Sequence, residues 1–194
     1  MANSATATPV GGTATQSGQK TTWVIDAAHS NVGFSIKHLM ISSVRGSFTE
    51  VHGTVKVDEN DPTTAEVDIT IPTASVTTRD EKRDGHLRSP DFFDAEQFPN
   101  MTFRSKRVER GSGDSFRVIG DLTIRGITRE VELDVELAGR AKDPWGNEKA
   151  GFEATTKIKR SDYGLTWNAA LETGGVLVGD DVKISIEAEL QKQG

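Results

Sequence analysis

The strongest constraint on the fold is a strict alternation of apolar and charged residues. In residues 130–137, Glu-Val-Glu-Leu-Asp-Val-Glu-Leu, every second side chain is apolar and every other one is acidic. Successive side chains of a β-strand point to opposite faces, so this pattern predicts a strand with one buried face. The same period of two recurs at 31–38, 65–71, 116–124, 152–158 and 182–190. The chain is therefore predicted to be all-β, with about eight long strands in an antiparallel barrel or sandwich.

The alternation changes phase in the segment 44–57. Val44 and Phe48 are even-numbered, whereas the three valines that follow them are odd-numbered. We interpret this change as a β-bulge or bend in one long apolar run, with Gly53 nearby to permit it.

One charged segment, 79–88, interrupts the β pattern. Gly85 in its middle lowers helix propensity by about 1 kcal/mol relative to alanine, so we expect one short helix between Arg79 and Leu87. Three phenylalanines, at 92, 93 and 98, follow it. A polar helix followed by aromatic residues within one long connection is interpreted as a helical cap over an apolar cavity.

Composition excludes several classes of function. The 194 residues fit one domain, which we place at 21–192. A net charge of -6 argues against nucleic-acid binding, and no apolar run is long enough for a transmembrane segment. The absence of cysteine excludes disulfides and thiolate chemistry. Residues 1–20 are predicted to be a disordered tail without the features of a secretory signal, so we expect a cytoplasmic protein.

Polar residues that could carry catalysis or bind a metal are sparse. The four histidines have no ligand spacing to one another, so we expect no metal site. Asp26, His29 and Ser30 invite comparison with a catalytic triad, but adjacent strand residues point to opposite faces and no G-x-S-x-G elbow is present. We interpret them as a tight corner whose side chains bond the local backbone. The chain is therefore not expected to be an enzyme.

The inward faces are rich in small and branched residues, which leave space inside a barrel. The side chains predicted to line that interior are Phe34, Ile36, His38, Phe48, Ile69, Phe92, Phe103, Leu122, Phe152, Ala154 and Trp167. Arg83 and His86 are candidates for holding an anionic head group at the mouth, although both could simply stabilise the helix. The alternative is a barrel with a filled core that binds a protein partner through its loops or edges.

A set of motifs, in order along the chain, resembles the YceI-like family of polyisoprenoid-binding, lipocalin-like proteins. The matching segments, which span Trp23 to Leu190, are WVIDAAHS (23–30), FSIKH (34–38), RGSF (45–48), SVTT (75–78), RDGHLRSPDFFD (83–94), FPNMTF (98–103), GDLTIRGIT (120–128), WG (145–146) and RSDYG (160–164). The HLRSPDFFD block is the most specific of them.

The resemblance implies an extended eight-stranded antiparallel barrel with a helical cap, enclosing a tunnel for a long isoprenoid lipid. The ligand would be a bound polyisoprenoid or isoprenoid quinone, with binding, carriage, storage or sensing rather than catalysis as the role. A homodimer is also expected, because barrel rims can pair and most soluble oligomers are two-fold symmetric.

Overall fold

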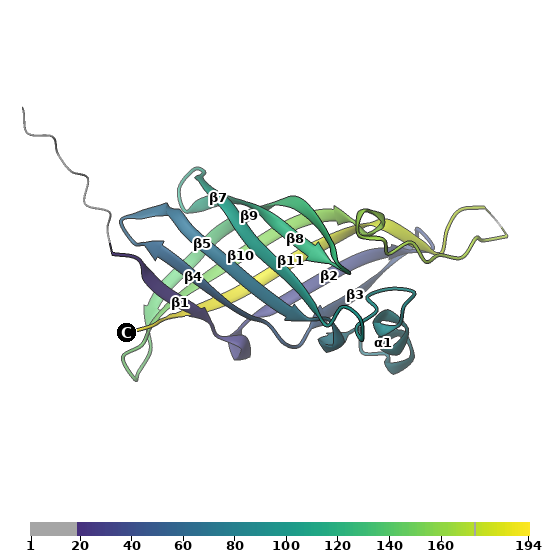
Figure 1. Cartoon of the computed structure of the whole chain (residues 1–194), viewed down its shortest axis with the longest axis horizontal. Coiled ribbons are helices and arrows are strands. Elements are labelled where there is room, and N and C mark those ends of the chain that lie inside the picture. The colour runs from purple at the N-terminus through teal and green to yellow at the C-terminus, as the bar shows by residue number, and fades with distance from the viewer. Residues whose placement is uncertain (1–18, 173) are drawn as a thin grey trace, which may run out of the picture.

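The computed structural model describes residues 19–172 and 174–194, whose strands form one closed antiparallel sheet (Figure 1). The strands are β1 (Thr21–Ile25), β2 (Asn31–His38), β3 (Ser42–Phe48), β4 (His52–Asp58), β5 (Asp61–Pro72), β6 (Val76–Thr77), β7 (Asn100–Arg110), β8 (Ser115–Ile124), β9 (Ile127–Lys142), β10 (Glu148–Lys159) and β11 (Val178–Lys192). The helices are α1 (Glu81–Arg88) and the short 3-10 segments η1 (Ala27–His29), η2 (Thr73–Ser75) and η3 (Arg160–Tyr163).

Over the described residues, these segments make the predicted eight-stranded barrel. β1 and β2 both pair with β11, one after the other along its length. On their other side, β1 pairs with β4 and β2 pairs with β3. β5 and β6 likewise pair with β4 and β3. The first six segments are thus three long, broken strands, and β7 to β11 complete the barrel with each strand beside the next. Alternation predicted about eight strands in an antiparallel barrel or sandwich, and the family resemblance implied the barrel.

The breaks in the three long strands lie between the same two rows of the sheet. One row contains Val32, Phe48 and Val76, and the other contains Val24, Thr54 and Asp68. The predicted bend between Val44 and Val57 is therefore real, but the strand is interrupted there and not merely bulged.

Gly53 lies in β4, just after the break, and its role in permitting the bend stays a prediction. A Cβ at Gly53 would lie 2.4 Å from Cδ1 of Ile69, so the glycine permits close packing on β5.

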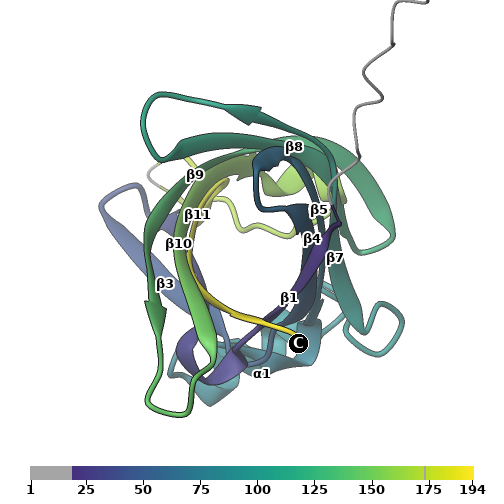
Figure 2. The ribbon, with the colours of Figure 1, turned by 90° about the vertical axis from the view of Figure 1, so that its left-hand side faces the viewer.

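The two ends of the barrel differ. The end with the β4–β5, β7–β8 and β9–β10 turns and the C-terminus is called the hairpin end; Figure 2 views the barrel from this side. The opposite cap end has the β2–β3 turn, α1 and the segment 160–177, which Figure 1 shows together on its right. The predicted hairpin tip at 143–147 is confirmed, because Oδ1 of Asp143 accepts from the backbone N–H groups of Trp145 and Asn147.

The predicted tail at 1–20 lies outside the described residues except for Gln19 and Lys20. The Lys20 ammonium contacts the Glu66 carboxylate and donates to the carbonyl of Thr64 at 3.1 Å. Within residues 19–172 and 174–194, the structure has no helix of sufficient length and hydrophobicity to span a membrane.

Candidate ligand-binding site

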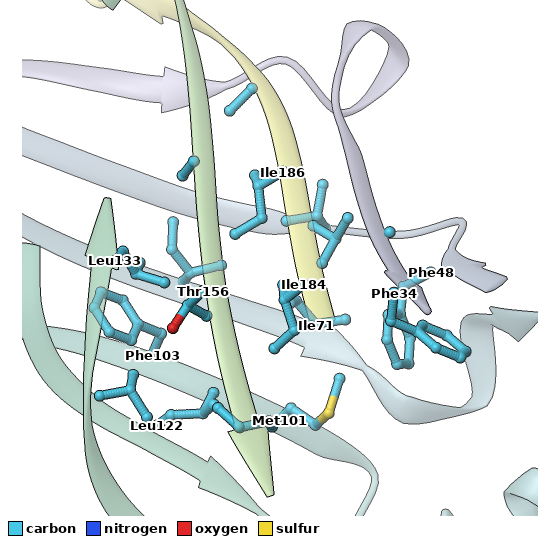
Figure 3. Close-up of a pocket in the computed structure, with 18 of the residues that line it drawn as sticks. Phe34, Phe48, Ile71, Met101, Phe103, Leu122, Leu133, Thr156, Ile184 and Ile186 are labelled. Atoms are coloured by element: carbon cyan, nitrogen blue, oxygen red, sulfur yellow. The ribbon is translucent and has the colours of Figure 1, made fainter. Parts of the chain in front are cut away.

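The barrel encloses a cavity of about 850 Å³ (Figure 3). Its wall is formed by the inward residues of the alternating strands, such as Val131, Leu133 and Val135 of β9. These three side chains face inward yet are only half-buried, because the space inside the barrel stays open. The filled core on which the interaction-module hypothesis depends is therefore not found in the described part of the chain.

Every residue predicted to line the interior borders this cavity. They come from β2 (Phe34, Ile36, His38), β3 (Phe48), β5 (Ile69), the segment after α1 (Phe92), β7 (Phe103), β8 (Leu122), β10 (Phe152, Ala154) and the 160–177 segment (Trp167). Their contact with a ligand stays a prediction.

Glycines keep aromatic rings against the wall of the barrel. Phe34 lies opposite Gly46 in the strand register, and a Cβ at Gly46 would be 2.4 Å from Cζ of Phe34. A Cβ at Gly120 would likewise be 2.7 Å from Cζ of Phe103. Each ring occupies the space that the Cβ of a larger residue would take at the glycine. The ring therefore lies against the wall and leaves the middle of the barrel open. The Phe34 ring also packs against the Phe48 ring, with centroids 5.8 Å apart.

The cap helix is fixed by two aspartates with different roles. Asp80 is the N-cap and accepts from the N–H of Arg83 at 3.1 Å. Asp84 is buried and accepts from the backbone N–H and the hydroxyl of Thr78 at 2.7 and 2.5 Å. Burial alone would raise the pKa of Asp84, but the bonds from Thr78 hold it below its ordinary value. Asp84 thus anchors the cap helix to the segment that precedes it.

Arg83 and His86, the candidate head-group residues, both border the cavity at the cap end. Arg83 donates from Nε to the Thr78 hydroxyl at 2.7 Å and from Nη2 to the Thr78 carbonyl at 3.1 Å. His86 lies 2.8 Å from Oδ2 of Asp91. Each is therefore already held by the protein. Nη1 of Arg83 also lies 3.9 Å from Oδ2 of Asp80, and the Arg83 side chain is 41% exposed.

Three rings meet at this end of the cavity. His86 stands edge-on to Phe92 and Trp167, with centroid distances of 5.0 and 4.7 Å. Phe92 and Trp167 are 5.4 Å apart. Of the three phenylalanines predicted to form the cap, Phe92 and Phe93 border the cavity, and Phe98 is not among the residues that line it. The ring cluster itself combines α1, the segment after it and a loop far along the chain.

Arg160 and Tyr163 border the cavity but were not singled out as site residues. Arg160 is buried and donates to four backbone carbonyls, those of Leu165, Trp167, Val178 and Gly179. Burial lowers its pKa. Arg160 thereby holds the loop that carries Trp167. The Arg-Ser-Asp-Tyr-Gly motif was the available signal, although the acceptors depend on the folded loop.

Burial raises the pKa of Tyr163 to about 12. Its hydroxyl is buried without a hydrogen-bond partner among the described residues. The phenol therefore remains protonated at physiological pH.

An apolar cluster lies at the hairpin end of the cavity. Trp23 is 4% exposed and packs with Ala150 and Leu190. The charged groups of Arg140 and Lys192 each lie 5.9 Å from the Trp23 ring, which is within cation–π range. Charged groups therefore border an apolar plug at this end.

Asp26, His29 and Ser30 form the predicted corner. The carboxylate of Asp26 accepts from the N–H of Ala28, and the hydroxyl of Ser30 donates to the Asp26 carbonyl at 2.7 Å. The ligand atoms of Asp26, His29 and Glu189 lie within 4.8 Å of one another, a grouping that local spacing did not reveal. The ammonium of Lys149 lies between the two carboxylates, 2.8 and 3.0 Å away, so a protein cation neutralises them.

Residues 23–190 match the family model of the YceI-like domain. The chain belongs to the YceI-like family. A UPF0312 protein of Staphylococcus aureus strain N315 is 45% identical over 170 residues, covering 87% of this chain and 96% of that protein. A Campylobacter jejuni YceI protein of known structure is 38% identical, with a TM-score of 0.70, over 87% of this chain and 96% of that one.

A further YceI-like fold is seen in a polyisoprenoid-binding domain from Saccharophagus degradans that is implicated in plant cell wall breakdown. It is 17% identical, with a TM-score of 0.62 over 88% of this chain and 98% of that one. At this identity the likeness concerns the fold. The YceI-like match begins at Trp23 and ends at Leu190, the pair that packs together at the hairpin end, so it spans the whole barrel.

Proposed function

We propose that this YceI-like barrel binds one long-chain isoprenoid lipid, of the polyprenyl or quinone type, along its cavity. The observation that carries the proposal is the apolar wall of the 850 Å³ cavity. Charged side chains border it near the ends, with Lys37 and Arg83 at the cap end and Glu59 and Arg140 at the hairpin end. A long hydrocarbon tail with a small polar head fits this distribution.

The energetics favour a ligand with many apolar carbons. Burial contributes about 0.8 kcal/mol per carbon, so each five-carbon isoprene unit offers on the order of 4 kcal/mol before ordering costs. Two or three buried units are then enough for tight binding. Affinity should follow tail length more closely than head-group chemistry.

The likeness to the Saccharophagus degradans domain, whose description names polyisoprenoid binding, supports an isoprenoid over a generic lipid. We propose that the role is carriage, storage or sensing and not chemical conversion. Asp26 with His29 does not border the cavity, and the His29 side chain is 66% exposed. His86, which lies 2.8 Å from Oδ2 of Asp91, does border it, and we propose that it contacts the head group and does not act as an acid or base.

The test is to purify the full chain after expression in a bacterium that makes polyprenyl lipids, extract it with organic solvent and identify the extract by mass spectrometry. We expect about one isoprenoid lipid per barrel, because the cavity is one continuous space. Native mass spectrometry of the intact protein gives the stoichiometry independently.

Delipidated protein should also bind added isoprenoid quinones, followed by quenching of Trp167, which borders the cavity. Trp145, 85% exposed at the hairpin tip, is replaced by phenylalanine to remove its background emission. An extract without isoprenoid, together with no quenching by any quinone of the series, would overturn the proposal and favour a protein partner.

A further inference from the structure

Exposed apolar side chains gather at the cap end, beside the mouth of the cavity. Among the described residues, the exposed large hydrophobics are Met40 (63%), Ile41 (83%), Val176 (42%) and Trp145 (85%). The first three, called the rim here, come from the β2–β3 turn and the segment 160–177. Trp145 is at the opposite, hairpin end.

The two loops of the rim are joined to each other and to the cavity wall. Leu39 donates its N–H to the carbonyl of Leu177 at 2.9 Å, and His38 pairs with Val178 in the sheet. His38, Leu177 and Val178 all border the cavity. Residues that line the cavity are thus directly followed or preceded in the sequence by the exposed residues of the rim.

The β2–β3 turn has an unusual sequence for its geometry. Leu39 and Met40 have φ values of 52° and 61°, and the N–H of Ile41 donates to the carbonyl of His38. Such a type I′ turn favours asparagine and glycine, because branched or bulky residues are strained at positive φ. Here it instead presents large apolar side chains to water. A local rule broken in this way is expected where a surface has a function.

A row of cations lies on the outer face of the strands that carry the rim. Arg45 of β3, Ser35 of β2, Lys183 of β11 and Lys157 of β10 are successive partners across the sheet. Lys157 and Lys183 are directly opposite each other, an arrangement that is unfavourable for like charges. Arg45, Lys157 and Lys183, called the basic row, are exposed and border one surface hollow with Asp134.

The charge of this face differs from that of the molecule. The chain carries a net charge of -6, yet Lys37 and Lys159 add two more exposed cations near the basic row. Three acidic residues lie among these five cations: Asp134, Asp180 and Asp181. Oδ2 of Asp181 is 3.2 Å from Nζ of Lys157, and Oδ2 of Asp180 is 4.0 Å from Nζ of Lys159, so the cations remain in excess. Exposed apolar side chains next to clustered cations match an anionic lipid surface, where the apolar groups enter the acyl boundary and the cations meet the headgroups.

We propose that the rim and the basic row together dock the barrel on an anionic phospholipid bilayer, with the cap-end mouth facing the membrane. The choice of a membrane as the partner rests on the proposed function, because an isoprenoid lipid resides in membranes and must pass from the bilayer into the cavity. Docking by the rim brings the mouth to the acyl boundary, so the ligand enters without crossing water.

The test is co-sedimentation of the full chain with phosphatidylcholine vesicles, with and without phosphatidylglycerol. We expect stronger association with the anionic vesicles, reduced by added salt. The Met40→Ser/Ile41→Ser variant should weaken association at least about tenfold, because it removes two large apolar side chains. Trp145→Ser, which alters an equally exposed side chain at the hairpin end, should bind as the wild type does.

Charge is tested with Arg45→Gln/Lys183→Gln, which should lose about tenfold or more in affinity for anionic vesicles and little for neutral ones. Its matched control is Lys56→Gln/Lys142→Gln, two exposed lysines nearer the hairpin end. Thermal unfolding confirms that all variants fold.

A rim variant that sediments with anionic vesicles as the wild type does would overturn the proposal. It would also be overturned if the wild type did not associate with vesicles and formed a dimer that the rim substitutions abolish, since the occupant of the rim would then be a second copy of the chain.

Vesicle association is measured separately from the lipid extract, so failure of the isoprenoid proposal and failure of the docking proposal are distinguishable. Transfer of a quinone from vesicles should slow in the rim variant while quenching by dissolved short-chain quinone is unchanged.

Discussion

The ammonium nitrogen of Lys149, on β10, lies 2.8 Å from Oδ2 of Asp26, at the break between β1 and β2. The same nitrogen lies 3.0 Å from Oε1 of Glu189, on β11. The Lys149 side chain is only 14% exposed, so one lysine joins β10 and β11 to the break between β1 and β2, where the barrel closes. This contact fixes the break at which the inward faces of β1 and β2 change phase.

Lys149→Gln is expected to destabilise the protein in a pH-dependent way. The hydrogen bond from Lys149, followed by that from His29, lowers the pKa of Asp26 from 3.8 to about 2. A carboxyl with a lowered folded-state pKa stabilises the fold above its unfolded pKa, and this contribution is lost as the pH falls through the folded value. The variant should lose about 1–2 kcal/mol of unfolding free energy at neutral pH.

Urea unfolding at a series of pH values measures this effect. The difference between wild type and Lys149→Gln should shrink as the pH falls from 3.8 to about 2. Lys157→Gln, which removes an exposed ion pair with Asp181, is the control and should change stability by less than about 1 kcal/mol. Curves for wild type and Lys149→Gln that stay parallel throughout this range would contradict the prediction.

Gly120→Ala is expected to cost about 1–3 kcal/mol of unfolding free energy, because overpacking forces the wall to shift. The added Cβ would lie 2.4 Å from the carbonyl oxygen of Arg104 and 2.7 Å from Cζ of Phe103. Gly139→Ala is the matched control, since it is also in a strand and a Cβ there would meet nothing within 4 Å. Equal stabilities of the two variants, measured by urea unfolding, would show that the Phe103 ring is not held against the wall.

The fold was predictable because its signal is local. A period of two sets which side chains face inward, and Val131 to Leu137 keep it without interruption, so strands and their buried faces follow from the sequence. The three breaks were harder. The break at η1 coincides with the tight corner predicted from Asp26, His29 and Ser30, and the one between Phe48 and Val51 shows as a change of phase within one apolar run. The break at η2 gave no comparable signal.

An open interior was predicted from the small and branched inward residues, but its volume could not be predicted from the pattern of apolar residues. Its volume depends on rings lying against glycines of a neighbouring strand, as Phe34 lies against Gly46, and this requires the strand register. Contacts between distant segments were also missed. Lys149 meets Asp26 across the closure of the barrel, and Arg160 binds carbonyls of a loop whose path no periodicity encodes.

His86→Ala is expected to weaken isoprenoid binding by a similar factor for every tail length, because His86 borders only the cap end of the cavity. The loss should be greater for phosphorylated heads than for quinones, since a charged acceptor gains most from a histidine or arginine donor. Arg83→Ala should follow the same pattern. Titrations across a series of tail lengths, followed by Trp167 quenching, give the factors.

His52→Ala is the control for this prediction, because His52 is an exposed residue of β4 that does not border the cavity. A loss that grows with tail length in His86→Ala would place the tail, and not the head, at the cap end.

Ala154→Trp is expected to shorten the usable cavity. Ala154 is a small inward residue of β10, paired with Val135 and Ile186, and it borders the cavity between its two ends. An indole there fills space that the distal isoprene units would occupy, while the barrel itself stays stable because a filled barrel is an ordinary arrangement. Long isoprenoids should therefore lose far more affinity than short ones, in contrast to the uniform loss expected for His86→Ala.

Thr155→Trp is the matched control, because the neighbouring side chain points to the outer face and is exposed. It should leave the dependence of affinity on tail length as it is in the wild type. Each unit excluded by Ala154→Trp forfeits the burial of five carbons, on the order of 4 kcal/mol before ordering costs, so the affinity curve should reach a plateau at a shorter tail. If Ala154→Trp and Thr155→Trp gave the same curve as the wild type, the tail would not lie in the cavity, and a partner bound on the outside of the barrel would become the better account of this chain.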